Sequence, residues 1–238
     1  MSALRAIFFD AVGTLIHPEP SAAAVYWTIG RSFGSRRTQA DIAARFVAAF
    51  QKQEAIDRLH GWITNEEREY QRWQHIVADV LDDVTDPAAV FTELYEHFKR
   101  PASWRCDAQS EAVLASLRAE GLAVGLASNF DGRLRGLVQE IKPLTVFGAS
   151  PLLAISSEVG YRKPAPEFYQ ALCQAAGCAP ARLLYVGDDL VNDYQGARSA
   201  GFHAILFDPR ERFTGAGYKR IGALEELTVA SRGRQRPE

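Results

Sequence analysis

The chain has 238 residues, of which 47% are hydrophobic and 24% are charged, and its formal net charge is −2. This ordinary globular balance argues against extensive disorder, and the charge gives no electrostatic reason to expect nucleic acid or an anionic membrane as a partner. No stretch approaches the roughly 18 apolar residues of a membrane helix, and 3 cysteines without a zinc-ligand pattern favour a reducing compartment, so we expect a cytoplasmic protein.

The first predicted element is a strand, Leu4–Phe9. It is apolar on consecutive residues, as expected in a parallel sheet that helices cover on both faces. The strand ends at Asp10, and a turn at Gly13 follows. A lone aspartate before a glycine turn is weak evidence for function, because both residues commonly terminate strands.

A helical insertion follows, from about Ser21 to Phe98, with no convincing strand. We predict a bundle of about four helices with a core of its own, within a unit of about residues 17–101. Pairs of residues with N-cap spacing mark three expected helix starts: Thr38 with Asp41, Thr64 with Glu67, and Asp86 with Pro87. The tryptophans in or beside the insertion are expected to pack rather than to contact a ligand: Trp27, Trp62, Trp73 and Trp104.

Four more apolar runs complete the predicted sheet. The carboxyl ends of parallel strands lie at one edge, where open α/β folds place their ligand sites. The predicted fold is therefore α/β, with a Rossmann-like core of residues 1–16 and about 102–238, and with the helical unit over the carboxyl edge of the sheet. The four runs are Leu122–Ala127, Leu152–Ser156, Leu183–Val186 and Ala204–Phe207.

Four short segments at the ends of predicted strands carry the candidate chemistry, although each alone is weak evidence. Three carboxylates near strand ends would repel one another unless a cation compensates them. Oxygen-only ligands are what Mg²⁺ prefers. The segments are Phe9–Leu15, Ala127–Asp131, Tyr161–Pro164, and Val186–Asp189 with Asp193.

Basic and neutral hydrogen-bonding groups accompany these carboxylates. Lys163 supplies a positive charge in addition to that of the expected cation, and Ser128 and Asn129 supply neutral hydrogen-bond donors. An anion held between them would face a carboxylate able to attack it. The combination suits phosphoryl transfer through a carboxylate nucleophile.

In this order and placement, the four segments resemble the four motifs of the haloacid dehalogenase (HAD) superfamily. The helical insertion after Asp10 resembles the mobile cap of that superfamily. Closer still, the motifs resemble those of the HAD-like hydrolases containing "domain 3", the REG-2-like group. The likeness covers Leu4 to about Phe207 and implies a HAD-like hydrolase.

The resemblance implies a catalytic role for four residues. Asp10 would attack the phosphorus of a small phosphorylated molecule and form an aspartyl-phosphate. Ser128 and Lys163 would hold the phosphoryl oxygens, and Asn129 would assist from the adjacent turn.

Mg²⁺ is the cofactor that the resemblance implies. Its ligands would be the Asp10 carboxylate, the backbone carbonyl of Val12, and Asp188. Asp193 would orient a metal-bound water or Lys163. Asp189 departs from the family pattern, because its position more often holds a neutral polar residue.

Val12 is the main departure from the family pattern. Family phosphatases usually carry a second aspartate there, which protonates the leaving alcohol and then activates water. General acid–base help is worth roughly 10²–10⁴-fold, so we expect a weak or narrow phosphatase, suited to good leaving groups such as acyl or aryl phosphates. His17 and Asp131 are the nearest candidate substitutes in the sequence, and each is more readily explained by a structural role.

Two alternatives of other classes stay open. Superfamily dehalogenases also lack the second aspartate, but they usually carry tyrosine there and have no acidic metal cluster, so Asp188, Asp189 and Asp193 argue for metal and phosphate. A non-catalytic protein that binds a metabolite or a partner could keep the same fold, because function resides in the site. The sequence carries no signal of oligomeric state.

Overall fold

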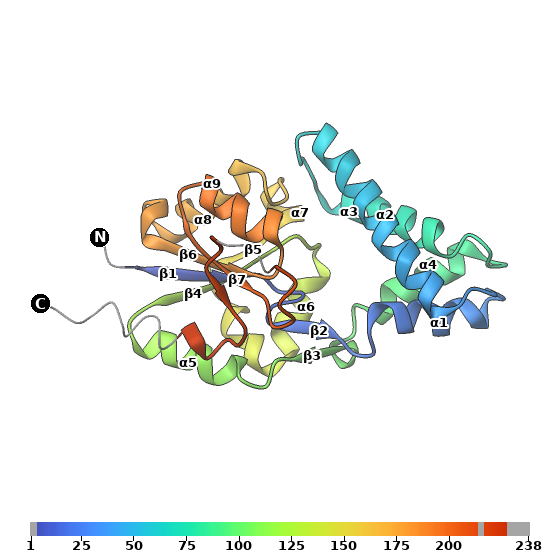
Figure 1. Ribbon diagram of the computed structural model, residues 1–238, viewed down its shortest axis with the longest axis horizontal. Coiled ribbons are helices and arrows are strands. Elements are labelled where there is room, and N and C mark those ends of the chain that lie inside the picture. The colour runs from blue at the N-terminus through green and yellow to red at the C-terminus, as the bar shows by residue number, and fades with distance from the viewer. Residues whose placement is uncertain (1–3, 214–216, 228–238) are drawn as a thin grey trace, which may run out of the picture.

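The computed structural model describes residues 4–213 and 217–227. Its larger part is built on a sheet in the order β5-β4-β1-β6-β7-β8, in which neighbouring strands are parallel. Figure 1 shows helices on both sides of this sheet. The predicted α/β fold and its five predicted strands are confirmed. The strands are β1 (Ala6–Phe9), β4 (Ala123–Ser128), β5 (Leu153–Ile155), β6 (Leu183–Gly187), β7 (His203–Phe207) and β8 (Arg220–Ile221).

Strand β1 shows why the predicted strands are apolar on consecutive residues. Ile7 and Phe9 pack into a cluster with α5 and α6, whereas Ala6 and Phe8 pack into a second cluster with α8 and α9 on the opposite face. Both faces of the sheet are therefore covered. The helices of this part are α5 (Ser110–Ala119), α6 (Arg133–Glu140), α7 (Ser156–Val159), α8 (Pro166–Ala176) and α9 (Gly196–Ser199), with a π-helical turn η4 (Leu190–Gln195) and 3₁₀ turns η1 (Pro101–Ser103), η2 (Lys142–Phe147) and η3 (Pro180–Arg182).

Three short strands have no counterpart in the sequence analysis. Strand β8 has two residues, and β2 (Ile16–Pro18) pairs antiparallel with β3 (Trp104–Cys106). Segments of two or three residues are too short to show an alternating pattern. The β2–β3 pair lies where the chain leaves the sheet domain for the helical insertion and where it returns.

The helical insertion contains the predicted set of four helices, α1 (Ala22–Ser32), α2 (Gln39–Leu59), α3 (Glu66–Val80) and α4 (Pro87–His97). They share a separate apolar cluster, as predicted. Thr38 and Asp41 form a reciprocal capping box at the start of α2, and Asp86 caps α4 with Pro87 at its first turn. These two predicted helix starts are confirmed.

The predicted capping box of Thr64 and Glu67 is wrong. The N-cap of α3 is Asn65, whose side-chain oxygen accepts a hydrogen bond from the Arg68 backbone N–H at 2.8 Å. Thr64 instead donates its hydroxyl to Glu69 Oε1 at 2.7 Å. Asparagine is at least as good an N-cap as threonine. The helix therefore begins one residue later than predicted, and the Thr64 hydroxyl is free to bond to the buried Glu69 carboxylate.

The four helices of the insertion lie beyond the carboxyl end of β1, the end that Asp10 directly follows (Figure 1). This is the edge at which open α/β sheets bind ligands. Among the described residues, none of the helices has the length and apolar character required to cross a membrane.

Candidate active site

Asp10 and Lys163 form the centre of the site. Asp10 follows β1, and its backbone N–H donates to the Val186 carbonyl at 2.9 Å, which places it beside the end of β6. Lys163 Nζ donates to Asp10 Oδ1 at 2.7 Å and to Asp193 Oδ1 at 2.6 Å. All three side chains are buried. The lysine therefore bridges the carboxylate expected to react and a second, deeper carboxylate.

Asp188 completes a cluster of carboxylates. One oxygen from each of Asp10, Asp188 and Asp193 lies within 4.8 Å of the others. Gly13 makes this approach possible, because a Cβ at that position would collide with the Asp188 carboxylate, and its φ of +92° favours glycine. The Asp10 loop and the end of β6 are thus packed together at the carboxyl edge of the sheet.

The electrostatics of the cluster suit a cation. Burial, and then the charge of Asp10, raise the pKa of Asp188 to about 6. Burial also raises the pKa of Asp193, and Lys163 opposes that rise. Three crowded oxygen donors whose charges are only partly compensated by Lys163 and Arg212 fit a hard divalent cation such as Mg²⁺.

Lys163 is held in place from several directions. Burial alone would lower its pKa, but the neighbouring carboxylates Asp10 and Asp193 outweigh burial and raise the pKa, so the ammonium stays charged. Nζ also lies 2.8 Å from the Tyr185 hydroxyl. Asn129 Oδ1 accepts from the Lys163 backbone N–H at 2.7 Å, and its Nδ2 donates to the Lys163 carbonyl at 3.0 Å.

Ser128 and Asn129 lie at the carboxyl end of β4, as predicted from the sequence. The Asn129 side-chain amide bonds to both the N–H and the carbonyl of Lys163. Asn129 therefore holds the loop of Lys163 in place. Ser128 is the last residue of β4, and it is buried. The seven site residues from the four motifs therefore meet at one edge of the sheet.

Val12 lies at the boundary between this site and an apolar space. Together with Asn129 and Phe130 it lines a cavity of about 200 Å³. The other walls come from the helical insertion, from the strands β2 and β3, and from Arg133 at the start of α6. The Gly13 backbone N–H bonds to the Ile16 carbonyl at 2.9 Å, which keeps the loop tight around Val12. An apolar side chain at this position matches the apolar wall.

Asp131 is engaged elsewhere, and His17 belongs to the short strand β2. Asp131 is fully buried and accepts from Arg133 Nε at 2.8 Å and from Nη2 at 2.7 Å, so both of its oxygens are paired. His17 lies in β2 opposite Arg105, and burial followed by the charge of Arg105 lowers its pKa. It is not among the described residues that line the cavity. The pairing with Arg133 explains Asp131 structurally, whereas no contact among the described residues assigns a role to His17.

A buried ionic network joins the helical insertion to the loop of Lys163, and no pattern in the sequence indicates it. Arg162 Nη1 donates to Glu69 Oε1 of α3, and its Nε lies 3.5 Å from Asp57 Oδ2 of α2. Arg72 Nε donates to the same Asp57 oxygen at 3.0 Å. The Arg162 backbone N–H also bonds to the Trp62 carbonyl at 2.9 Å. The insertion is thereby tied to the residue beside the site lysine.

Arg162→Met is expected to lower the free energy of unfolding by about 3–5 kcal/mol, because it leaves the buried Glu69 carboxylate without its cation. Denaturant unfolding of the purified protein measures this. The matched control is Arg135→Met, since the ion pair of Arg135 with Glu158 is half exposed and its loss should cost about 1 kcal/mol or less. Equal effects of the two substitutions would contradict the assignment.

Arg212 and Tyr185 are two further site residues that the sequence did not reveal. Arg212 Nη2 donates to Asp188 Oδ2 at 3.2 Å and to the Asp188 carbonyl at 3.0 Å. Tyr185, within β6, donates its hydroxyl to the Ala127 carbonyl beside Lys163. Arg212 lies far along the chain from every motif, and Tyr185 reads as one more apolar residue of a strand, so neither gave a signal.

These features define an α/β protein with a carboxylate–lysine site under an inserted helical unit. Residues 4–201 match the haloacid dehalogenase-like hydrolase family. The chain therefore belongs to that family, as the motifs had indicated.

Relatives of this chain include haloacid dehalogenase-like hydrolase domain-containing protein 3 of Bos taurus, 26% identical, with 85% of this chain and 81% of the relative covered. The rhythmically expressed gene 2 protein of Drosophila melanogaster is 29% identical, with 87% and 84% covered. A phosphoserine phosphatase of Thermus thermophilus is 27% identical, with 95% and 99% covered. The resemblance to the "domain 3" group is confirmed.

Solved structures show the same fold. A HAD hydrolase from Bacillus subtilis bound to magnesium has a TM-score of 0.74 at 16% identity, with 97% of this chain and 99% of that chain covered. The L-2-haloacid dehalogenase of Xanthobacter autotrophicus has a TM-score of 0.74 at 18% identity, with the same coverage. A magnesium-bound hydrolase and a dehalogenase match equally well, so the residues of the site have to distinguish the two activities.

Proposed function

We propose that this chain is a Mg²⁺-dependent phosphatase, weak or narrow in its activity, that acts on a small phosphorylated molecule through an aspartyl-phosphate on Asp10. The observation that supports this most strongly is the position of Lys163 Nζ, 2.7 Å from Asp10 and 2.6 Å from Asp193, beside a third carboxylate. A lysine in this place can hold the transferred group against the nucleophile. The 27% identity to a phosphoserine phosphatase points to the same type of reaction.

Each motif residue has a proposed task in this reaction. The carboxylate of Asp10 attacks phosphorus, and Lys163 and the Ser128 hydroxyl hold the phosphoryl oxygens. Asn129 keeps the Lys163 loop in place through two hydrogen bonds to its backbone. The Asp193 carboxylate keeps Lys163 oriented from the buried side.

Mg²⁺ is the proposed cofactor, held by the carboxylates of Asp10 and Asp188 and by the backbone carbonyl of Val12. When bound, it would neutralise charge on the carboxylates and on the transferred phosphoryl group. The crowding of Asp10, Asp188 and Asp193 supports this proposal.

We also propose a division into a core of residues 1–16 and 102–238 and a cap of residues 17–101. The separate apolar cluster of the four helices and the β2–β3 pair at the two crossings support this division. Free cysteines at positions 106, 173 and 178 are consistent with the proposed cytoplasmic location.

The test is a screen of phosphorylated small molecules with and without Mg²⁺, comparing the wild type with Asp10→Asn. The proposal predicts phosphate release that requires both the metal and Asp10. Release of halide from 2-haloacids without Mg²⁺ would overturn it in favour of the dehalogenase. Binding of a phosphorylated compound, with no release and no phosphorylated protein, would favour a non-catalytic binding protein.

A further inference from the structure

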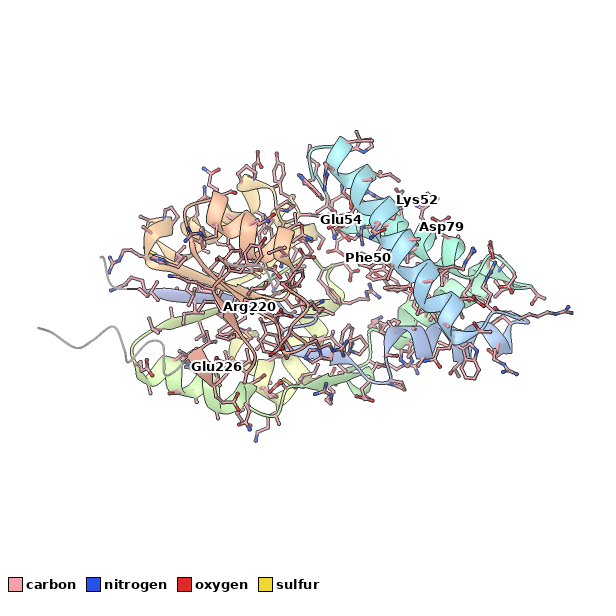
Figure 2. The ribbon with its side chains drawn as sticks, in the orientation of Figure 1. Phe50, Lys52, Glu54, Asp79, Arg220 and Glu226 are labelled. Carbon is pink, nitrogen blue, oxygen red and sulfur yellow. The ribbon has the colours of Figure 1, made fainter. Side chains whose placement is uncertain are left out.

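The cavity beside Val12 has an unusual wall for a site that handles phosphate. More than half of its lining residues are aromatic, and they come from every helix of the insertion as well as from the core. Representative rings are Phe46 and Phe50 of α2, Trp73 of α3, Tyr95 of α4, and Trp104 and Phe130. Figure 2 shows Phe50 on the side of α2 that is turned toward the core, whereas Lys52 lies on the other side with its partner Asp79.

The cavity adjoins the candidate active site through two of its lining residues, Val12 and Asn129. Val12 is two residues from Asp10, and Asn129 is hydrogen-bonded to the backbone of Lys163. Both residues line the cavity. In a phosphoryl transfer the leaving group departs in line with, and away from, the attacking oxygen. The group attached to phosphorus would therefore enter the cavity.

The charges in the cavity wall argue against a second charged or strongly polar group on the substrate. Among the described residues that line the cavity, Arg133 alone carries a charge. Its guanidinium is paired with both oxygens of Asp131 and stacks 3.9 Å from the centre of the Tyr95 ring. A carboxylate, an ammonium or a sugar with several hydroxyls would find few partners there, and unpaired polar groups are costly to bury.

The size of the cavity fits one aromatic ring. A dry cavity of about 150 Å³ lined by apolar residues can bind benzene, and this cavity has about 200 Å³. Edge-on ring contacts already occur within the wall, as between Phe50 and Trp73 with centroids 5.8 Å apart. A flat ring that enters the cavity would find the same type of contact with the wall.

From this geometry we infer that the substrate is a small aryl phosphate, whose aromatic ring occupies the cavity while its phosphoryl group lies at Asp10 and Lys163. This inference rests on the proposed function and narrows it. The Asp10 oxygen forms a bond to phosphorus as the bond between phosphorus and the aryl oxygen breaks. The electron pair leaves on that oxygen, and water then cleaves the aspartyl-phosphate to phosphate and free Asp10.

The leaving group explains the valine at position 12. A phenol ionises with a pKa of about 10, far more easily than an aliphatic alcohol, so its oxygen departs as phenolate and takes a proton from water afterwards. Val12 then replaces an acid that this leaving group does not need, and it extends the apolar wall. The missing acid fits any good leaving group, and the aromatic wall of the cavity narrows this to an aryl group.

The experiment compares two substrates in two variants. Ala22 lines the cavity at the start of α1, whereas its neighbour Ala23 is not among the lining residues. Ala22→Phe should lower kcat/KM for phenyl phosphate by at least about tenfold, because it fills part of the space for the ring. In the same variant, turnover of acetyl phosphate, which has a good leaving group and no ring, should fall much less than turnover of phenyl phosphate, and Ala23→Phe should change neither activity.

A binding measurement separates this inference from the proposed function. Phenyl phosphate added to Asp10→Asn with Mg²⁺ should change the tryptophan fluorescence, since Trp73 and Trp104 line the cavity, and Ala22→Phe should weaken that binding. If acetyl phosphate is hydrolysed but phenyl phosphate neither binds nor reacts, or if Ala22→Phe lowers both activities equally, the aryl assignment is wrong and the phosphatase stands. If phenyl phosphate binds in the cavity but nothing is hydrolysed, the ring site stands and the phosphatase is wrong.

Discussion

Asp10→Asn is expected to abolish phosphate release, by a factor on the order of 10⁴ or more, because the amide cannot attack phosphorus. The fold should survive, since the change removes one charge from a crowded cluster of three carboxylates. Steady-state phosphate release in saturating Mg²⁺, measured with acetyl phosphate and with phenyl phosphate, gives the result.

A matched control for this substitution is Asp79→Asn. Asp79 is a surface carboxylate of α3 that pairs with Lys52 at 2.8 Å, far from the site in the sequence and on the other side of α2 from Phe50 (Figure 2). Its loss should leave turnover unchanged and should cost about 1 kcal/mol of stability or less. If Asp10→Asn keeps more than about one tenth of the wild-type rate in a folded protein, the nucleophile is another group.

Val12→Asp is expected to have the second large effect, which is a rise in phosphatase turnover. An aspartate at this position would supply the proton donor that family phosphatases usually have, worth roughly 10²–10⁴-fold for a poor leaving group. Burial beside the apolar wall would raise the pKa of the new carboxyl and favour its protonated, donating form. Turnover of an alkyl phosphate should therefore rise by about 10²-fold, and turnover of a generic aryl phosphate should rise less.

Val12→Asn is the control for the change in shape and polarity. It places an isosteric amide against the same wall without an ionisable group, so it should give no increase with either substrate. If Val12→Asp, folded and metal-bound, leaves the alkyl phosphate rate unchanged or lower, then the missing acid is not what limits turnover by this chain.

The sequence predicted the sheet well because each long strand is apolar without interruption. The run around Phe8 can be buried on both faces only when helices cover both, and this is what the structure shows. The β2–β3 pair and β8 escaped prediction because two or three residues carry no periodicity. The start of α3 was misplaced by one residue because Thr64 and Asn65 are both good N-caps, and a tertiary contact to Glu69 decided between them.

The site was predictable where residues follow strands and was hidden where they come from elsewhere. Asp10, Ser128 and Asp188 sit at strand ends, so their meeting follows from parallel topology. Arg162 and its partners on α2 and α3 belong to separate units of the chain, and no local pattern relates them. Trp73 and Trp104 were expected only to pack, yet both line the cavity beside Val12. A single sequence does not show which aromatic side chains of a helix pack inside the helical insertion and which face the sheet domain.

The central claim is that Asp10 becomes phosphorylated, and the most direct test is the intact mass of the protein after exposure to acetyl phosphate and Mg²⁺. Val12 cannot activate water, and Asp131 is paired with Arg133, so the aspartyl-phosphate should persist. We expect the wild type to gain the mass of one phosphoryl group and Asp10→Asn to gain none. No gain in the wild type, together with hydrolysis that survives Asp10→Asn, would contradict the account.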